Sequence, residues 1–157
     1  MIIRKRIVSL FLAMTLLVPL TQITPLNAES NTKEVDVMFT HDTHSHLDSF
    51  TTNVDGELQK VGGFARIKTL IHEQKKENPN TLILDGGDFS MGTLILTVYD
   101  TQAAELRMLG YLGYDVTTLG NHEFDYRSKG LANMLKVAKA SGKTTPELVI
   151  IKWRKTP

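Results

Sequence analysis

The alternation of short apolar runs with longer amphipathic stretches constrains the fold of this chain more than any other feature of its sequence. Four strands are expected, at residues 35–39, 81–84, 116–119 and 148–151. Apolar side chains recur at helical spacing between them, which predicts three helices at residues 64–76, 101–112 and 128–140. Strands that alternate with helices form mainly parallel sheets through right-handed crossovers, so we expect an α/β fold built of βαβ units. The segment 40–56 is expected to be a loop.

Each expected helix has one apolar face. Gly113 suits the C-terminal cap of the second helix, and Ser128 is a candidate N-terminal cap for the third. The residues expected to face the core are Phe64, Ile67, Leu70 and Ile71 in the first helix, Ala103, Leu106, Leu109 and Leu112 in the second, and Leu131, Met134, Leu135 and Ala138 in the third.

The first 28 residues have the pattern of a secretory signal peptide. Three basic residues precede an apolar run from Ile7 to Leu20, and a polar stretch then ends in the small residue Ala28. The run is shorter than the roughly 20 residues that a membrane-spanning helix needs, although an uncleaved anchor is the alternative. We expect residues 1–28 to be removed on export. Residues 29–157 would then form a mature domain without a stable membrane span, secreted, periplasmic or in the cell envelope.

Charge and cysteine content exclude several classes of function. Residues 1–28 carry three positive charges and no negative ones, so their removal changes the formal charge from +1 to −2. A nearly neutral chain without a basic patch does not favour binding to a nucleic-acid duplex. The chain has no cysteine, which excludes disulfides, thiolate catalysis and thiolate zinc sites.

Polar side chains that can bind metals follow the first three expected strands. HDTHSH contains Asp42 and His44, and residues two apart at an extended strand end point the same way. GGDFSMG contains Asp88, and GNHE contains Asn121 and His122. Each cluster alone also fits a chance pair or a plain turn. The carboxyl ends of parallel strands meet at one sheet edge, however, and aspartates gathered there repel one another unless cations lie between them. Oxygen and imidazole donors suit zinc, manganese or iron.

Together these clusters resemble a known signature. The series Asp-x-His, Gly-Gly-Asp and Gly-Asn-His-Glu is similar to the first half of the calcineurin-like metallophosphoesterase signature. The stretches FTHDTHSH, VGGFAR, DGGDFSMGT and LGNHEFDY resemble the secreted 5′-nucleotidase and 2′,3′-cyclic-nucleotide phosphodiesterase branch, over roughly residues 35–150. The resemblance implies the N-terminal half of a four-layer α/β/β/α sandwich, and metal-dependent hydrolysis of nucleotide phosphate esters.

The resemblance also implies ligands for two divalent ions, zinc, manganese or similar. Asp42 and His44 would bind the first ion, Asp88 would bridge both, and Asn121 would bind the second through its amide oxygen. Two ions about 3.5–4 Å apart lower the pKa of a shared water and clamp the phosphoryl oxygens during in-line attack.

A catalytic pair is implied by the same resemblance. His122 would approach the scissile phosphate as an electrostatic stabiliser or as a proton donor to the leaving oxygen, and Asp125 would orient it. Glu123, which lies between them in the sequence, is interpreted as a supporting or structural residue.

Several further residues have a structural interpretation beside a functional one. His41 and His46 flank the Asp-x-His pair, and a solvated loop position is preferred to metal support for both. Asp85 suits a turn cap as well as metal support. His72 is expected on the surface of the first helix, and Trp153 either in the core or at a frayed end.

Part of the family site has no counterpart in this sequence. Family members carry further histidines downstream, including a Gly-His-x-His pair, and a C-terminal nucleotide-binding domain, whereas this chain has no histidine after His122. We therefore expect a domain truncated at its C-terminus, with an incomplete second metal site, an exposed apolar sheet face, low stability and a tendency to aggregate. The alternatives to part of an active hydrolase are a truncated, catalytically inactive metal-binding remnant and an unrelated α/β binding module with coincidental turns.

Overall fold

A parallel four-stranded sheet forms the centre of the described part of the chain. The computed structural model describes residues 34–150. The strands lie in the order β1 (Val37–Thr40), β4 (Leu82–Asp85), β5 (Val116–Thr117) and β6 (Glu147–Leu148). Every neighbouring pair is parallel. The α/β fold with a mainly parallel sheet, predicted from the alternation of strands and helices, is therefore confirmed.

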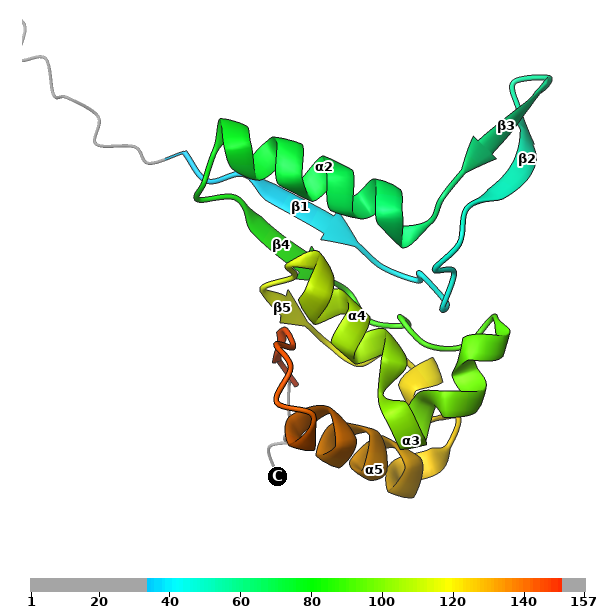
Figure 1. The fold of residues 1–157 in the computed structure, drawn as a ribbon, viewed down its shortest axis with the longest axis vertical. Helices are drawn as coiled ribbons and strands as arrows, with labels where there is room; N and C mark the ends of the chain where they lie inside the picture. The colour runs from blue at the N-terminus through cyan, green and yellow to red at the C-terminus, as the bar shows by residue number, and fades with distance from the viewer. Residues whose placement is uncertain (1–33, 151–157) are drawn as a thin grey trace, which may run out of the picture. The chain divides into compact units, whose positions relative to one another are not determined.

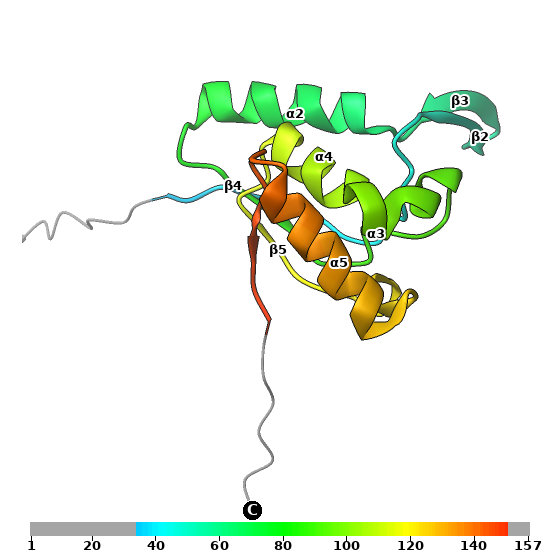
Figure 2. The ribbon, with the colours of Figure 1, turned by 60° about the horizontal axis from the view of Figure 1, so that its bottom comes forward.

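The helices cover one face of this sheet (Figures 1 and 2). The core consists largely of side chains from α2 (Phe64–Glu77), α4 (Ala104–Leu112) and α5 (Arg127–Ala140). Because side chains alternate between the two faces of a strand, Met38 and Ile83 point into this core.

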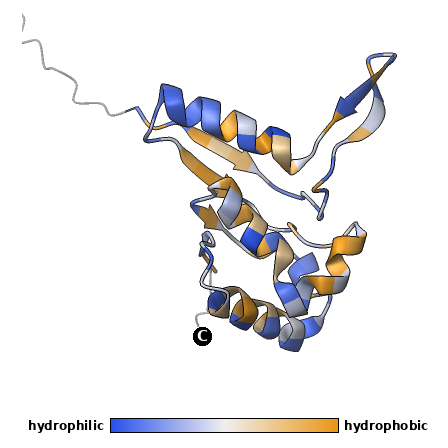
Figure 3. Cartoon of the chain, in the orientation of Figure 1, coloured by the Kyte–Doolittle hydropathy of each residue, from blue (hydrophilic) through white to orange (hydrophobic). Residues whose placement is uncertain are grey.

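The opposite face of the sheet is apolar and exposed. Phe39 is 60% exposed, and the cross-strand partners Val37 and Leu82 are exposed as well. Figure 3 shows the apolar character of β1 and β4. The prediction of an exposed apolar sheet face is therefore confirmed for these two strands.

An antiparallel hairpin interrupts the expected first loop. β2 (Phe50–Val54) pairs with β3 (Glu57–Val61), and the hairpin projects from the N-terminal end of α2 (Figure 1). Asp55 and Gly56 form its turn with φ of 53° and 89°. Positive φ at both positions is what two-residue hairpin turns require, and Asp-Gly is a preferred pair there. The prediction of a loop over residues 40–56 is therefore wrong for Phe50–Val54.

The helix α2 lies where the first helix was predicted, but one of the four residues predicted to face the core does not do so. Phe64 and Ile71 are buried and Ile67 packs against the core, whereas Leu70 is 55% exposed. At about 100° per residue, the first three fall within about 60° of one another and Leu70 lies a further 60° round the helix. The apolar stripe that reaches the sheet is therefore narrower than predicted.

The second expected helix is divided into shorter elements. A 3₁₀ helix, η1 (Leu94–Val98), leads into α3 (Tyr99–Gln102), and α4 begins after Ala103. Ala103 has φ 48°, in the left-handed region, so a continuous helix through this position is excluded. Gly113 caps α4 as expected. The predicted inward residues are all buried: Ala103, Leu106, Leu109 and Leu112.

The third helix begins one residue earlier than its predicted cap. Tyr126 occupies the N-cap of α5, and no side-chain capping bond is present there within the described residues, so the prediction for Ser128 is wrong. Leu131, Met134 and Ala138 are buried and Leu135 packs against them, as predicted. The strands β5 and β6 are shorter than the runs that predicted them.

Two expectations fall outside the described residues: the signal peptide at 1–28 and the position of Trp153. Among residues 34–150, no helix has the length and apolar character needed to cross a membrane.

Candidate active site

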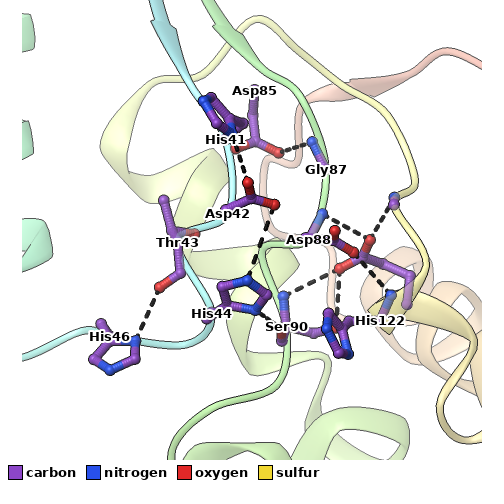
Figure 4. Close-up of polar contacts among 12 residues, drawn as sticks. His41, Asp42, Thr43, His44, His46, Asp85, Gly87, Asp88, Ser90 and His122 are labelled. Carbon is purple, nitrogen blue, oxygen red and sulfur yellow. Dashed lines mark hydrogen bonds and ion pairs between the residues drawn. The ribbon is translucent and has the colours of Figure 1, made fainter.

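Three loops meet at the carboxyl ends of β1, β4 and β5 (Figure 4). The backbone N–H groups of Asp42 and His44 donate to the carbonyl oxygens of Gly87 and Asp88, each at 3.1 Å, so the first loop runs beside the second. The third loop joins them where the backbone N–H of His122 donates to Oδ1 of Asp88 at 2.8 Å. One sheet edge therefore brings together residues from all three clusters that the sequence singles out.

The backbone of these loops is left-handed at the predicted ligands. Asp42, His44 and Asp88 have φ of 52°, 45° and 50°, and Ser45 has φ 53°. Such values are uncommon for residues with a side chain and concentrate at functional sites. The expectation of an extended strand end at Asp42 and His44 is wrong, because β1 ends at Thr40 and both residues curl out of it.

Asp42 lies close to two imidazoles. Its Oδ1 is 3.9 Å from Nε2 of His44, and its Oδ2 is 2.7 Å from Nδ1 of His41. The hydrogen bond with His41 lowers the pKa of Asp42 and favours the charged carboxylate, the form that binds a cation. His41 is exposed as expected, yet it contacts a predicted ligand, and its place directly before the Asp-x-His pair is the signal that could have shown this. His46 is exposed, as expected.

Asp88 and Asn121 face each other across two loops. In one orientation of the Asn121 amide, its oxygen points toward Oδ2 of Asp88. With the amide turned by 180°, its nitrogen donates to that oxygen and its own oxygen accepts from the N–H of His122, both at 3.3 Å. Two oxygens at hydrogen-bonding distance need a cation or a proton between them, so the first orientation suits a bound cation and the second suits the protein alone.

Glycine allows this close approach. A Cβ atom at Gly120 would collide with Oδ1 of Asp88 and would lie 2.7 Å from its backbone nitrogen. A Cβ atom at Gly87, which has φ 89°, would lie 2.5 Å from the backbone nitrogen of Gly120. The glycines of the Gly-Gly-Asp and Gly-Asn-His motifs thus allow the backbones of the two loops to lie in contact.

His122 and Asp125 form the expected pair. Nδ1 of His122 is 2.9 Å from Oδ2 of Asp125, and this hydrogen bond raises the pKa of His122 because the carboxylate stabilises the imidazolium. The ring of His122 lies edge-on to that of His44, with centroids 5.0 Å apart. The pair therefore lies beside the predicted metal ligands, and Nε2 is the nitrogen of His122 that the carboxylate leaves free.

Asp85 ties the strands together below the site. It is buried, and its carboxylate accepts from the hydroxyls of Thr40 and Thr117 at 3.1 and 2.7 Å and from the N–H of Gly87 at 3.0 Å. The bond to Gly87 is the turn-capping role that sequence reasoning left open beside metal support. Burial raises the pKa of Asp85, because the buried carboxylate is poorly solvated.

The donor set fits divalent cations, although the side chains converge in pairs. Two ligands of one tetrahedral zinc ion, each roughly 2.0–2.2 Å from it, lie about 3.4 Å apart, so the 3.9 Å between Asp42 and His44 would have to shorten slightly for both to bind one ion. Nδ1 of His44 lies 3.3 Å from the carbonyl oxygen of Ser90, so a proton on Nδ1 would leave Nε2 free to bind a metal. Within the described part of the chain, no three His, Asp or Glu side chains are placed to hold one ion together.

Comparison with known proteins gives a consistent set of relatives. The family model for calcineurin-like phosphoesterases matches residues 36–149. The 5′-nucleotidase of Rattus norvegicus is 40% identical over 124 residues, which are 76% of this chain and 21% of that protein. The NAD 5′-nucleotidase of Haemophilus influenzae is 30% identical over 131 residues, which are 77% of this chain and 22% of that protein.

The structure has relatives of the same kind. The crystal structure of a 5′-nucleotidase precursor from Thermus thermophilus matches with a TM-score of 0.61 and 35% sequence identity. The match covers 72% of this chain and 21% of that chain. The present chain thus spans only 21–22% of the length of these three relatives.

Proposed function

This chain belongs to the calcineurin-like phosphoesterase family, and on that premise we propose that it supplies metal-binding and catalytic residues for the hydrolysis of nucleotide phosphate esters. A phosphomonoester is the primary substrate class, and a cyclic phosphodiester is the second. The nucleotide part of the proposal rests on the relatives that are named as 5′-nucleotidases, all of them longer than this chain.

The observation that supports the proposal most strongly is the meeting of three loops at one sheet edge. Asp42 and His44 arrive from β1, Asp88 from β4, and Asn121 with His122 from β5. A fold that needed only turns at these places would not require two backbones close enough to exclude a Cβ atom, as those of Gly120 and Asp88 are.

Asp42, His44, Asp88 and Asn121 are the residues that would hold divalent ions. We infer that Asp42 and His44 would hold one ion, and that Asp88 and the amide oxygen of Asn121 would contribute to holding a second. A bound zinc or manganese ion lowers the pKa of a water molecule and neutralises charge on the phosphoryl oxygens. The lowered pKa of Asp42 favours its charged form, and a proton on Nδ1 of His44 would leave Nε2 free for a metal.

His122 is the group that would handle the proton. As the bond between phosphorus and the leaving oxygen breaks, the protonated imidazole can donate from Nε2 to that oxygen. Its contact with Asp125 fixes the ring through Nδ1 and raises the pKa of His122, which favours the protonated imidazole.

An assay on the full chain tests the proposal. The chain should release p-nitrophenol from p-nitrophenyl phosphate when manganese or zinc is added, lose this activity with a chelator, and contain bound metal. Asp88→Asn should abolish both metal content and hydrolysis. Metal binding without hydrolysis would favour the alternative of an inactive metal-binding protein, and absence of both would overturn the proposal.

We also propose that the protein is exported and acts in the cell envelope or outside the cell. The support is the basic, apolar and small-residue pattern of residues 1–28. In a secretion-competent bacterial host, the mature protein should begin close to residue 29 when its N-terminus is determined by mass spectrometry. Recovery of the intact chain from the membrane fraction would instead favour an uncleaved anchor.

A further inference from the structure

Glu123 is a charged residue that is 0% exposed and lies between the loops after β4 and β5. Its Oε2 accepts the backbone N–H groups of Asp88 and Gly120 at 2.9 and 2.7 Å. Its Oε1 accepts the backbone N–H and the hydroxyl of Ser90 at 3.1 and 2.9 Å. All four partners are donors, so an ionised carboxylate, which only accepts, satisfies the whole set without a proton.

The residues joined in this way carry the predicted ligands. One donor is the amide of Asp88 itself, and another is the amide of Gly120, directly before Asn121 in the chain. The carboxylate of Asp88 then accepts the backbone N–H of His122, so a closed ring of hydrogen bonds links the two loops. The distance between the predicted ligands on the two loops therefore depends on the length of the Glu123 side chain.

The backbone of Glu123 is anchored independently of its carboxylate. The hydroxyl of Tyr99 donates to the carbonyl oxygen of Glu123 at 2.9 Å, and the Tyr99 ring is buried and stacks on Tyr126 with centroids 5.7 Å apart. Loss of the carboxylate alone would thus leave the η2 turn (His122–Phe124) attached to the core. The side chain acts on the loops and not on the turn that carries it.

We propose that Glu123 is a positioning residue that sets the separation of Asp88 and Asn121 for binding divalent cations, an inference that rests on the proposed function. Burying four polar donors is unfavourable, and their hydrogen bonds to the Glu123 carboxylate offset this free energy. Hydrogen bonds to a charged acceptor are stronger than those to a neutral one. Residues that orient metal ligands in this way typically change metal affinity by roughly 10–100-fold when they are altered.

Glu105, on α4, provides a matched control, because it is also a glutamate that is 0% exposed. It accepts one hydrogen bond, from the hydroxyl of Ser45 at 2.9 Å, and glutamine preserves that acceptor. Glu123→Gln replaces one acceptor oxygen by an NH₂ group that faces donors. Glu123→Asp keeps the charge but is one methylene shorter, so it cannot reach both loops.

The experiment measures manganese affinity by isothermal titration calorimetry on the full chain, together with amide hydrogen exchange by NMR. Glu123→Gln and Glu123→Asp should each weaken manganese binding roughly 10–100-fold, and Glu105→Gln should leave it unchanged. The amides of Asp88 and Gly120 should exchange faster in both Glu123 variants, while core amides stay protected. If Glu123→Gln does not fold, the manganese affinity and amide exchange of Glu123→Asp test the proposal instead.

The outcomes separate this inference from the proposed function. Wild-type affinity in folded Glu123 variants would overturn the positioning role and leave the proposed function standing. A wild-type chain that binds neither manganese nor zinc would overturn the proposed function, and exchange would then decide alone whether Glu123 holds the loops. Unchanged exchange at Asp88 and Gly120 in the variants would overturn that role as well.

Discussion

The hydroxyl of Ser45 donates to Oε1 of Glu105 at 2.9 Å, while Oε2 of Glu105 has no hydrogen-bond partner among residues 34–150. Because Glu105 is buried, this second oxygen has lost its contact with water without a replacement. Burial accordingly raises the pKa of Glu105, since the charged form is poorly solvated there. The folded chain thus binds a proton at Glu105 more tightly than the unfolded chain does.

This relationship predicts how stability depends on pH. A group whose pKa is raised by folding stabilises the fold below its unfolded pKa, and this contribution is lost as pH rises through the folded pKa. Glu105→Gln cannot ionise and keeps the acceptor for Ser45. The variant should therefore match the wild type below about pH 4 and exceed its free energy of unfolding at pH 7 by roughly 1–3 kcal/mol.

Urea denaturation of both proteins between pH 4 and 8 provides the measurement. Glu57→Gln is the control, because Glu57 is exposed on β3. A stability difference for Glu105→Gln that does not vary with pH would contradict the prediction.

The exposed sheet face predicts self-association. Val37 and Leu82 are cross-strand partners on this face, and large exposed apolar patches favour contact with other molecules. The double variant Val37→Thr, Leu82→Thr should lower the mass-average size in light scattering and change the free energy of unfolding by less than about 1 kcal/mol.

A substitution on the other face of the same strand tests the reasoning. Ile83, next to Leu82, is buried, and Ile83→Ala should cost about 2–5 kcal/mol of stability. If the threonine variants destabilise the chain as much as Ile83→Ala does, the face is not free in solution.

The sequence was informative where a local pattern decides the structure. Strand–helix alternation predicts the parallel sheet, and helical spacing predicts the buried faces of α4 and α5, because each depends on neighbours in the chain. Leu70 was predicted to be buried but is exposed, because its burial depends on how wide a strip of α2 contacts the core. The hairpin carried a local signal as well, since two alternating runs flank Asp55 and Gly56.

The meeting of the three loops at one sheet edge could be predicted from the sequence, but the geometry within the loops could not. Asp42 and His44 lie close together because the backbone at both residues is left-handed. The sequence predicted extended backbone at these two positions. The role of Glu123 depends on amides of residues more than thirty positions away, at Asp88 and Ser90, and such contacts leave no local pattern. The periodicity of apolar residues indicates which face of a helix or strand is buried. The way in which separate loops converge depends instead on the arrangement of the whole sheet.

The contact between the Gly120 and Asp88 backbones predicts a steric effect on metal binding. Gly120→Ala would place a methyl group against the Asp88 carboxylate, so that side chain must shift. Manganese affinity should fall by roughly 10-fold or more, as expected when a metal ligand is displaced. Calorimetric titration of the folded variant gives the measurement.

A second glycine separates this effect from general loss of stability. Gly56 lies in the hairpin turn with φ 89°, and no atom of the described residues would lie within 4 Å of a Cβ there. Gly56→Ala should cost about 1 kcal/mol of stability through backbone strain and leave manganese affinity intact. Equal losses of affinity in both variants would show that the contact with Asp88 is not the cause.

The pair of His122 and Asp125 predicts a kinetic effect without a binding effect. His122→Ala removes the proposed proton donor, so kcat for p-nitrophenyl phosphate should fall by about 10²–10⁴-fold. Asp125→Asn should lower kcat less, because the ring loses its orienting carboxylate but remains present. Manganese affinity should stay unchanged in both variants, since neither side chain is a predicted ligand. His72→Ala, on the exposed surface of α2, should retain full activity. Loss of manganese binding in His122→Ala, to the extent expected for Asp88→Asn, would assign His122 to the metal rather than to the leaving oxygen.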